Sequence, residues 1–475
     1  MSAPAAAFSR RIAEALQDRQ LRLALDRTTS RFTALRAAGL ASLPDADAVR
    51  DRARAIRLET LDHLDQHLER FEAAVTDAGG QVHWAADARE ANAIVLQIAR
   101  SRGVFHVVKS KSMVSEEMGL NPTLIDAGVD VVESDLGEYI IQLAGETPSH
   151  IIAPAVHKTR EQIGQLLADK LGVPMTDDPA RMTAIARSTL RQVFLRADMG
   201  LTGVNFGVAS TGTLAIVTNE GNASLGVSAP RVHVALMGIE RVVPTLDDLA
   251  VMLQVLARSA TGQKLTVYTD LITGPRRTEP DDPDGPDELH VVLLDNGRSR
   301  LVGSEFGEAL ACIRCGACLN ACPVYQQIGG HAYGSVYSGP IGAVITPSLD
   351  RDGPWHVLPD ASSLCGACRE VCPVRIDLPR MLLALRADAV RAGKTGRWGR
   401  LAFRLYRVVA THPWLFRRAV SVARWATEIL AVAGWVRRLP PPLSGWTRFR
   451  DFPVVASRTF TERMRERPRR PWRQQ

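Results

Sequence analysis

Hydrophobic positions recur at helical spacing in the first part of the chain. The clearest stretch consists of Leu61, Leu64, Leu68, Phe71 and Val75. A Gly79-Gly80 pair, a typical stop signal for a helix, follows it. Five positions are too few to indicate a coiled coil. We therefore expect residues 1–79 to form a helical segment that packs against the next domain.

From about residue 80, short apolar runs alternate with helical patterns. The expected strands are residues 81–85, 104–108, 129–132, 213–218, 231–237, 265–270 and 291–294. The expected helices are residues 88–101, 120–127, 158–171 and 245–258. This alternation predicts an α/β domain over residues 80–297 with a largely parallel sheet, whose ligands bind beyond the carboxyl ends of the strands. Residues 276–287, rich in Pro, Asp and Gly, should form an exposed loop.

All seven cysteines of the chain lie in two short runs. The first run is Cys312-x2-Cys315-x2-Cys318-x3-Cys322-Pro323, and the second is Cys365-x2-Cys368-x3-Cys372-Pro373. The first is the ligand pattern of bacterial ferredoxins, in which three thiolates hold one iron–sulfur cluster and the fourth binds the other cluster of the pair. Crossed ligation then predicts two 4Fe–4S clusters. One is expected on Cys312, Cys315, Cys318 and Cys372, and the other on Cys322, Cys365 and Cys368.

The second run lacks its first cysteine, and Ser362 stands at that position. Ser362 could bind iron through its oxygen, a partner or solvent could complete the site, or the second cluster could be a three-iron form. An open iron could also act as a Lewis acid toward a hydroxy acid. A stable electron relay is the interpretation that paired clusters favour.

Zinc and disulfides explain these cysteines less well. Structural zinc sites close with four ligands, usually from paired Cys-x2-Cys units. An odd number of clustered cysteines, with no apolar secretory signal after Arg10-Arg11, is not typical of a disulfide framework. Two runs that each end in Cys-Pro therefore indicate iron–sulfur chemistry.

A glycine-rich stretch, residues 329–342, separates the two cysteine runs. Its glycine content is too high for a long helix, because glycine in a helix interior is destabilising. We expect this stretch to wrap the clusters or to form part of a docking face. Residues 378–392 follow a helical pattern again.

Residues 203–226 combine five glycines with several hydroxyl residues. Backbone N–H groups in such turns can bind anions, so Thr211 and Gly212 are candidate anion-binding residues. Glu220, in the same stretch, is a candidate acid or base. Ordinary turn chemistry would explain these residues equally well.

A second candidate site follows the strand expected at residues 104–108. Lys109 and Lys111, at the carboxyl end of this strand, could hold a substrate carboxylate. The neighbouring Ser115-Glu116 pair also suits a helix N-terminus, which needs no ligand. No Gly-x-Gly-x-x-Gly motif follows a strand and no Walker motif is present, so the usual nucleotide cofactors are not indicated.

The chain has 475 residues and a net charge of +7, and this charge is unevenly distributed. Residues 397–475 contain 18 Arg, no Lys, four acidic residues and six of the eight tryptophans. A basic region rich in Trp and Arg, residues 393–475, suggests an anionic partner: protein, lipid headgroup or, least favoured, nucleic acid. No stretch of about 18 apolar residues occurs, so we expect a cytoplasmic protein able to bind peripherally at the inner face of the membrane.

Several of these stretches together resemble a known family, that of lactate utilisation protein B, the iron–sulfur member of a three-protein L-lactate oxidation system. The resemblance covers nearly the whole chain. It rests on residues 109–113, 207–222, 311–324, 364–374 and 439–453. It implies a LUD domain similar to the NagB/RpiA/CoA-transferase-like fold over residues 80–297. An α-helical ferredoxin-type domain with two cluster sites is implied over residues 298–392.

The resemblance also implies a function. The family's cluster ligands fall on the same two sets of cysteines, so the three-cysteine second site is similar to the family. Glu220 loosely resembles the catalytic glutamate that CoA transferases carry in a short polar turn. The chain would be the electron-transfer subunit of an oxidoreductase complex that converts L-lactate, or another 2-hydroxy acid, to pyruvate or its analogue. Its partners would be a cysteine-rich protein and a second LUD-domain protein. The alternative is a redox-sensing regulatory or binding protein whose basic tail contacts an anionic partner.

Overall fold

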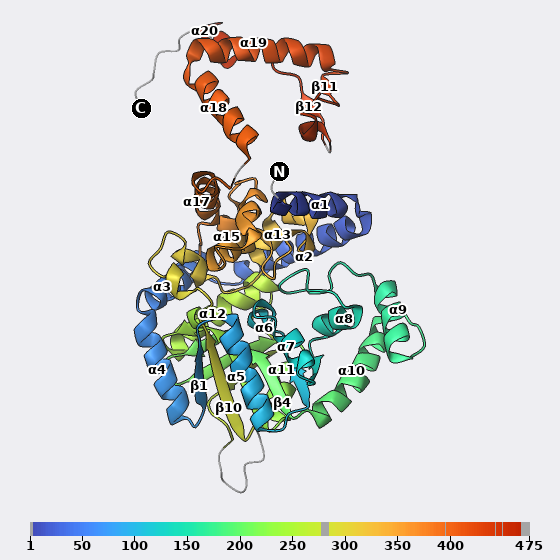
Figure 1. Ribbon diagram of the computed structural model, residues 1–475, viewed down its shortest axis with the longest axis vertical. Helices are drawn as coiled ribbons and strands as arrows, with labels where there is room; N and C mark the ends of the chain where they lie inside the picture. Colours follow the sequence, from blue (N-terminus) through green and yellow to red (C-terminus); the bar gives the residue numbers. More distant parts are fainter. Residues whose placement is uncertain (1–2, 277–284, 395, 442, 449, 467–475) are drawn as a thin grey trace. The chain divides into compact units, whose positions relative to one another are not determined.

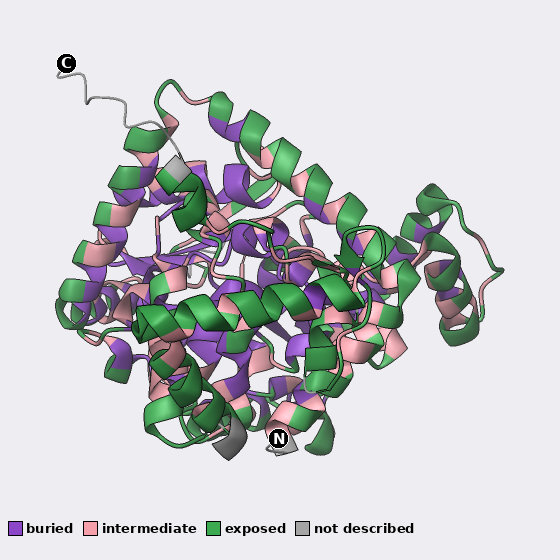
Figure 2. Ribbon diagram, turned by 90° about the horizontal axis from the view of Figure 1, so that it is seen from above, coloured by how far each residue is buried: buried purple, intermediate pink, exposed green. Residues whose placement is uncertain are grey.

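The structure is a computed structural model that describes residues 3–276, 285–394, 396–441, 443–448 and 450–466. The chain divides into two compact units, Met1–Ala392 and Gly393–Gln475, and each is described by itself. Most of the loop expected at residues 276–287 lies outside the described residues. Figure 2 shows buried residues concentrated in the interior and exposed residues along the outer sides of the helices.

The N-terminal segment is helical, as its pattern predicts. Its helices are α1 (Ala3–Gln17), α2 (Arg19–Ala41), α3 (Ala46–Asp62) and α4 (Leu64–Asp77). The side chains of Asp18 and Asp45 cap α2 and α3 by accepting hydrogen bonds from backbone N–H groups of the first turn. The periodic apolar residues of α4 are buried in a core shared with the sheets, so this helix is part of the α/β unit.

A six-stranded parallel sheet forms the centre of the first unit, in the order β1-β10-β7-β4-β2-β3. Its strands are β1 (Gln81–Ala85), β2 (His106–Lys109), β3 (Asp130–Glu133), β4 (Met199–Gly203), β7 (Val232–Gly238) and β10 (Glu288–Leu294). The α/β class and the parallel sheet agree with the sequence prediction. β4 was not predicted, because two of its five residues are glycines. A Cβ atom at Gly200 would lie 1.8 Å from the carbonyl oxygen of Gly226, so only glycine fits there.

Helices cover the parallel sheet on both faces (Figure 1). They are α5 (Ala88–Ser101), α6 (Met113–Glu117), α7 (Leu120–Asp126), α8 (Leu136–Ala144), α10 (Pro179–Arg196) and α11 (Asn222–Ser228). α9 (Arg160–Leu171) packs against α8 and α10, and α12 (Leu246–Ala260) packs against α2 and α3. α5 and α7 pack on one face, with a shared apolar core. On the other face lie α4 and a second sheet.

The second sheet has four strands in the order β8-β5-β6-β9. Its strands are β5 (Phe206–Val208), β6 (Thr213–Thr218), β8 (Val242–Val243) and β9 (Tyr268–Ile272). β6 pairs antiparallel with β5 and β9, whereas β8 runs parallel to β5. The sequence indicated β6 and β9 but assigned them to the parallel sheet, because strand periodicity does not specify the pairing partner.

The cysteine-containing part of the chain consists of short helical segments. They are η2 (Ser299–Leu301), η3 (Gly307–Ala311), α13 (Ala317–Ala321), α14 (Tyr325–Ile328), η4 (His331–Tyr333), α15 (Gly339–Leu349), η5 (Pro354–Asp360), α16 (Ala367–Val371) and α17 (Leu378–Arg391). The glycine-rich stretch does end in a helix, because α15 begins at Gly339 and most of it is buried. A Cβ atom at Gly339 would lie 2.6 Å from Leu319, so this glycine permits close packing. A buried helix is not a docking face, and that part of the expectation is wrong for α15.

The second unit is small and largely exposed. It contains α18 (Arg397–Thr411), α19 (Pro413–Leu430), η6 (Leu443–Thr447), α20 (Phe460–Glu466) and a two-stranded sheet of β11 (Trp435–Val436) and β12 (Phe452–Pro453). Phe403, Tyr406 and Trp425 are each at least 65% exposed, so the helices present aromatic side chains to the outside of this unit. Within the described residues, no helix combines the length and apolar character needed to cross a membrane.

A buried histidine in the parallel sheet predicts acid lability. The Nε2 atom of His233 lies 2.8 Å from Thr202 Oγ1, and burial lowers the pKa of His233 to about 3. Because an unfolded chain binds a proton at this histidine near pH 6.5, folding stability should fall as the pH drops through that value. We expect His233 to lower the free energy of unfolding by about 2 kcal/mol between pH 7 and pH 5.

This prediction is tested with His233→Gln, which keeps a side-chain amide near Thr202 but does not titrate. The thermal midpoint of each protein is measured at pH 7 and pH 5. We expect the thermal midpoint of the variant to fall by less between pH 7 and pH 5 than that of the unchanged chain. Equal losses in the two proteins would contradict the role assigned to His233.

Candidate metal and ligand sites

The two cysteine runs fold as structural repeats. Arg314 and Leu364, each just before the second position of its run, have positive φ angles of 58° and 56°. Gly316 and Gly366, two residues later, also have positive φ angles, of 74° and 89°. A left-handed conformation at a non-glycine residue is costly, so its occurrence at both equivalent positions indicates a turn that the surroundings impose.

Ser362 takes the place of a cysteine in this repeated turn. The backbone N–H of Arg314 donates to Cys312 Sγ at 3.4 Å, and the N–H of Leu364 donates to Ser362 Oγ at 3.1 Å. The serine oxygen therefore accepts the hydrogen bond that corresponds to the one accepted by the sulfur of Cys312. This position agrees with the one obtained by counting residues along the sequence.

Further backbone N–H groups point at the sulfurs. The N–H of Ala317 donates to Cys315, and the N–H of Ala367 donates to Cys365. Each of these bonds lowers the pKa of its thiol and so favours the thiolate. Hydrogen bonds to ligand sulfurs are also one of the factors that set the reduction potential of an iron–sulfur cluster.

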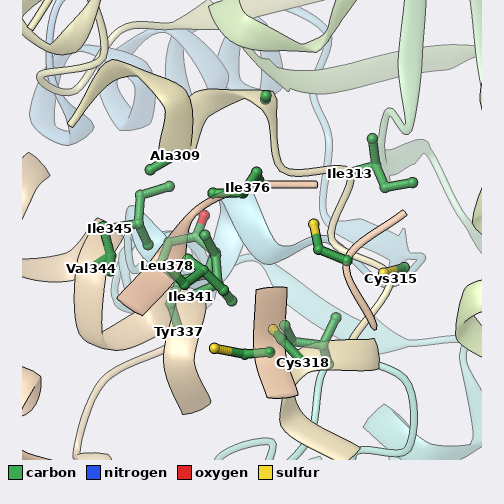
Figure 3. Packing of buried hydrophobic residues seen from close by; sticks show 14 of the residues in the cluster. Ala309, Ile313, Cys315, Cys318, Tyr337, Ile341, Val344, Ile345, Ile376 and Leu378 are labelled. Atoms are coloured by element: carbon green, nitrogen blue, oxygen red, sulfur yellow. The ribbon is translucent and has the colours of Figure 1, made fainter. Parts of the chain in front are cut away.

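One group of thiols lies in the interior. Burial, with Cys372 and Cys312 nearby, raises the pKa of Cys315 to about 12. Burial and the same neighbours raise the pKa of Cys318 well above its ordinary value. Figure 3 shows Cys315 and Cys318 near apolar side chains such as Ile313. Three members of this group belong to the first run, and Cys372 joins them from the second.

The remaining three thiols form an adjoining group. Burial, with Cys322 and Cys365 nearby, raises the pKa of Cys368 to about 12. Cys365 itself is exposed. Cys368 is among the neighbours that raise the pKa of Cys318, so the two groups of thiols are neighbours. The grouping follows the crossed pattern expected of a pair of clusters.

The donor set of the interior group fits an iron–sulfur cluster. Its four cysteines line a small cavity of about 20 Å³ together with apolar residues and Arg314. Alone, buried thiols with raised pKa values stay protonated, whereas iron ligation requires and stabilises thiolates. Among the described residues, no group of three or more His, Cys, Asp or Glu side chains is arranged to hold a single metal ion. In a four-iron cluster, by contrast, each iron takes its own thiolate.

Arginines surround the interior group. Arg50 donates to the carbonyl oxygen of Cys372 at 2.9 Å, and Arg241 donates to that of Cys312 at 3.2 Å. Arg36 donates at 2.6 Å to the carbonyl that precedes Cys372. These guanidinium groups bring positive charge close to the thiolates in a poorly solvated interior, where charge attraction is strong.

A buried ion-pair network joins the α/β domain to the first cysteine run. Arg298, whose side chain is fully buried, donates to Glu117 at 2.7 and 2.8 Å and to Glu240 at 2.7 Å. Arg314 lies 3.6 Å from Glu240 and stacks over the ring of Tyr337 at 4.4 Å. Burial alone would raise the pKa of Glu240, but the arginines lower it to about 2.

A pocket of about 250 Å³, here called the junction pocket, lies where the α/β domain meets this cysteine run. It opens beyond the carboxyl ends of β2 and β4, as expected for a parallel sheet. Its polar and charged lining residues are Ser110, Lys111, Ser112, Asp135, Asn205, Thr218, Asn219, Glu220, Asn222, Arg241, Thr261, Thr266 and Arg314.

Two of the predicted site residues line the junction pocket, namely Lys111 and Glu220. Lys111 lies 3.9 Å from its nearest acidic partner, Glu138, which is at the limit of an ion pair. Glu220 accepts a hydrogen bond from the N–H of Leu136 at 3.1 Å. Burial and the nearby Asp135 raise the pKa of Glu220 above its ordinary value.

The other predicted residues lie elsewhere. The Nζ atom of Lys109 is fully buried and bonds to Glu133 at 2.5 Å and Glu116 at 3.2 Å, so its charge is already paired. Thr211 and Gly212 form the turn between β5 and β6. The Thr211 hydroxyl bonds to a neighbouring threonine, and Gly212 packs against the backbone of α4. Their glycine and hydroxyl content reflects turn geometry and close packing.

Sequence reasoning missed Arg241 and Arg314 as pocket residues, whereas Thr218 and Asn222 lie in the candidate stretch of residues 203–226. Arg314 lies between Cys312 and Cys315 in the ferredoxin run, whose spacing indicates a role for the cysteines but not for the residues between them. Arg241 carries no motif, since its position depends on the pairing of the adjoining strand β8 in the second sheet. Only the fold brings these four residues together.

Comparison with known proteins gives the family. The profile of the LUD domain matches residues 68–294, that of a 4Fe-4S dicluster domain matches residues 308–376, and that of the C-terminal region of lactate utilisation protein B matches residues 390–469. Lactate utilization protein B of Shouchella clausii (strain KSM-K16) is 43% identical over 96% of each chain. The chain belongs to the lactate utilization protein B family.

Other members of this family are equally similar. Lactate utilization protein B of Geobacillus thermodenitrificans (strain NG80-2) is 45% identical over 97% of each chain, and that of Bacillus pumilus (strain SAFR-032) is 42% identical over 98% of each chain. A solved structure, a DUF162 family protein from Deinococcus radiodurans, is 15% identical and covers 49% of this chain and 98% of its own. Its TM-score is 0.27. Family membership links the chain to lactate utilisation and to 4Fe–4S chemistry.

Proposed function

We propose that the chain is the iron–sulfur electron-transfer subunit of a complex that oxidises L-lactate to pyruvate. The family and its 4Fe-4S dicluster domain support this role. The observation that carries it is the division of seven thiols into two adjoining groups, one buried except for the half-buried Cys312 and one with an exposed cysteine. Two clusters in series can carry, one at a time, the two electrons that the oxidation of a 2-hydroxy acid releases.

The proposed ligands follow the two groups of thiols. Cys312, Cys315, Cys318 and Cys372 would hold the first cluster, and Cys322, Cys365 and Cys368 the second. Ser362 would complete the second site through its oxygen, and the turn position that it shares with Cys312 supports this assignment. The arginines around the first group would stabilise the anionic site and so favour its reduced form.

Partners and location follow from the exposed parts of the chain. Cys365 is exposed, so the second group is the natural contact for an electron-transfer partner. We infer that a cysteine-rich protein and a second LUD-domain protein complete the complex. The exposed aromatic and arginine side chains of α18 and α19 suit peripheral contact with anionic lipid at the inner face of the membrane. We also infer that the LUD domain has the NagB/RpiA/CoA-transferase-like fold.

Iron analysis of anaerobically purified protein tests the cofactor assignment. We expect about eight irons per chain, or about seven if the second cluster is a three-iron form. The visible spectrum of the protein, mixed with the products of neighbouring genes, should bleach when L-lactate is added. A Cys318→Ser variant should not bleach. Full bleaching in that variant, or protein without iron, would refute the proposed role.

A further inference from the structure

We propose that the junction pocket binds a small 2-hydroxy acid, with its carboxylate between Arg314 and Lys111 and its hydroxyl on the side of Asn222 and Glu220. This inference deepens the proposed function and takes the identity of the ligand from it. The pocket itself stands on the geometry of this chain, and its occupancy can be measured without any partner protein.

The first support is a buried cation with an unused donor. The Arg314 side chain is 7% exposed, and its Nη2 atom lies 3.6 Å from Glu240. Its Nη1 atom is buried and, among the described residues, has no hydrogen-bond partner. Because guanidinium donors are strongly polar, a buried donor without a partner is costly unless a ligand fills the role. Arg314 lines the junction pocket, and a carboxylate there would complete its bonding.

The second support is a pair of unused atoms in the same lining. Thr218 Oγ1 and Asn222 Oδ1 are buried and lack a partner in the described part of the chain. Both residues line the junction pocket. The amide oxygen of Asn222 can only accept a hydrogen bond, whereas the threonine hydroxyl can donate or accept. A ligand that bonds to both residues must therefore accept a hydrogen bond from Arg314 and donate one to Asn222.

The charges of the lining agree with this assignment. The pocket has three cationic residues, Lys111, Arg241 and Arg314, and two acidic ones, Asp135 and Glu220. Lys111 is held only weakly by its 3.9 Å contact with an acidic side chain, so it can turn toward an anion. Burial raises the pKa of Glu220, which suits a carboxylate that accepts a hydrogen bond from a ligand hydroxyl.

The chemistry distinguishes a hydroxy acid from the corresponding oxo acid. Both have a carboxylate, but only the hydroxy acid can donate to Asn222 or Glu220. A site built around a hydroxyl discriminates against a ligand that lacks it, because the buried acceptor at Asn222 Oδ1 is then left unpaired. At about 250 Å³, the pocket is of a size for a small molecule, not for a macromolecular segment.

The test is titration calorimetry on the full, iron-loaded chain without partners, with L-lactate, pyruvate and propionate as probes. We expect L-lactate to bind about tenfold more tightly than pyruvate or propionate. Lys111→Met should weaken L-lactate binding at least tenfold, and Thr218→Val several-fold. The matched controls are Lys158→Met and Thr211→Val, which replace a lysine paired with Glu146 and a threonine in the turn between β5 and β6. Both should leave the affinity unchanged.

The outcomes separate this inference from the proposed function. Unchanged affinity in both Lys111→Met and Thr218→Val, or no binding of L-lactate by the iron-loaded chain, would overturn the inference. If lactate-dependent bleaching with partners still occurred in that case, the substrate would bind on a partner and the electron-transfer role would stand. Conversely, lactate binding without any bleaching in the complete mixture would support the pocket and refute the proposed function. Weaker binding in Thr211→Val than in Thr218→Val would place the anion site in the β5–β6 turn and overturn the inference.

Discussion

Replacement of Cys372 by alanine is expected to remove the same cluster as replacement of Cys315, although the two residues are 57 positions apart and belong to different runs. Cys372 is the first of the charged neighbours that, after burial, raise the pKa of Cys315, whereas Cys368, four residues before Cys372, lies close to Cys322. Crossed ligation therefore predicts about four irons per chain in either variant, instead of about eight.

The double variants make this expectation decisive. Cys315→Ala/Cys372→Ala should retain about four irons, because both ligands belong to one cluster. Cys315→Ala/Cys322→Ala should retain almost none, because it removes a ligand from each cluster. If each run instead bound its own cluster, Cys315→Ala/Cys372→Ala would remove a ligand from each cluster and retain almost no iron. Cys315→Ala/Cys322→Ala would then retain about four irons. Iron analysis and the spectrum of the reduced protein at low temperature distinguish the two arrangements.

The cluster-binding turns could be predicted from the sequence because ligand spacing is a local property. A run of cysteines at fixed intervals needs only a short backbone turn, and the turns around Arg314 and Leu364 repeat it. Even the position of Ser362 in the repeated turn was visible by counting. The periodic apolar residues of α4 and the strands of the parallel sheet were predictable for the same reason, since their periods are local.

The pocket could not be predicted in this way, because its lining depends on pairing between distant segments. β4 contains two glycines, and one of them, Gly200, lies against Gly226 of α11. The sequence of β4 by itself therefore does not indicate a strand. Lys109 and Lys111 look equivalent in the sequence, yet they point to different sides of the chain. Lys109 is part of a buried ion-pair network, and Lys111 lines the junction pocket. Arg314 gains its significance only from the α/β domain packed against it.

The second large effect is expected at Arg298. Replacing it by methionine should destabilise the first unit by about 3–5 kcal/mol, because Glu117 and Glu240 would then be buried without their main counter-ion. Burial alone would raise the pKa of each of these carboxyl groups, and Arg298 is the largest of the influences that hold both pKa values below the ordinary range. Thermal midpoints of the unchanged chain and the variant, measured under identical conditions, give the direction and size of the loss.

The pH dependence and a matched control identify the cause. Without Arg298 the pKa values of Glu117 and Glu240 should rise, so these carboxyl groups bind protons when the variant folds. The variant should therefore lose less stability relative to the unchanged chain at pH 5 than at pH 8. Adding Glu240→Gln should restore part of the stability, since it removes one of the uncompensated charges. Arg300→Met is the control, because Arg300 is exposed and donates a hydrogen bond to the carbonyl oxygen of Leu349. Its effect should stay within about 0.5 kcal/mol. An equal loss in both variants would show that the network around Arg298 does not stabilise the junction between the α/β domain and the cysteine runs.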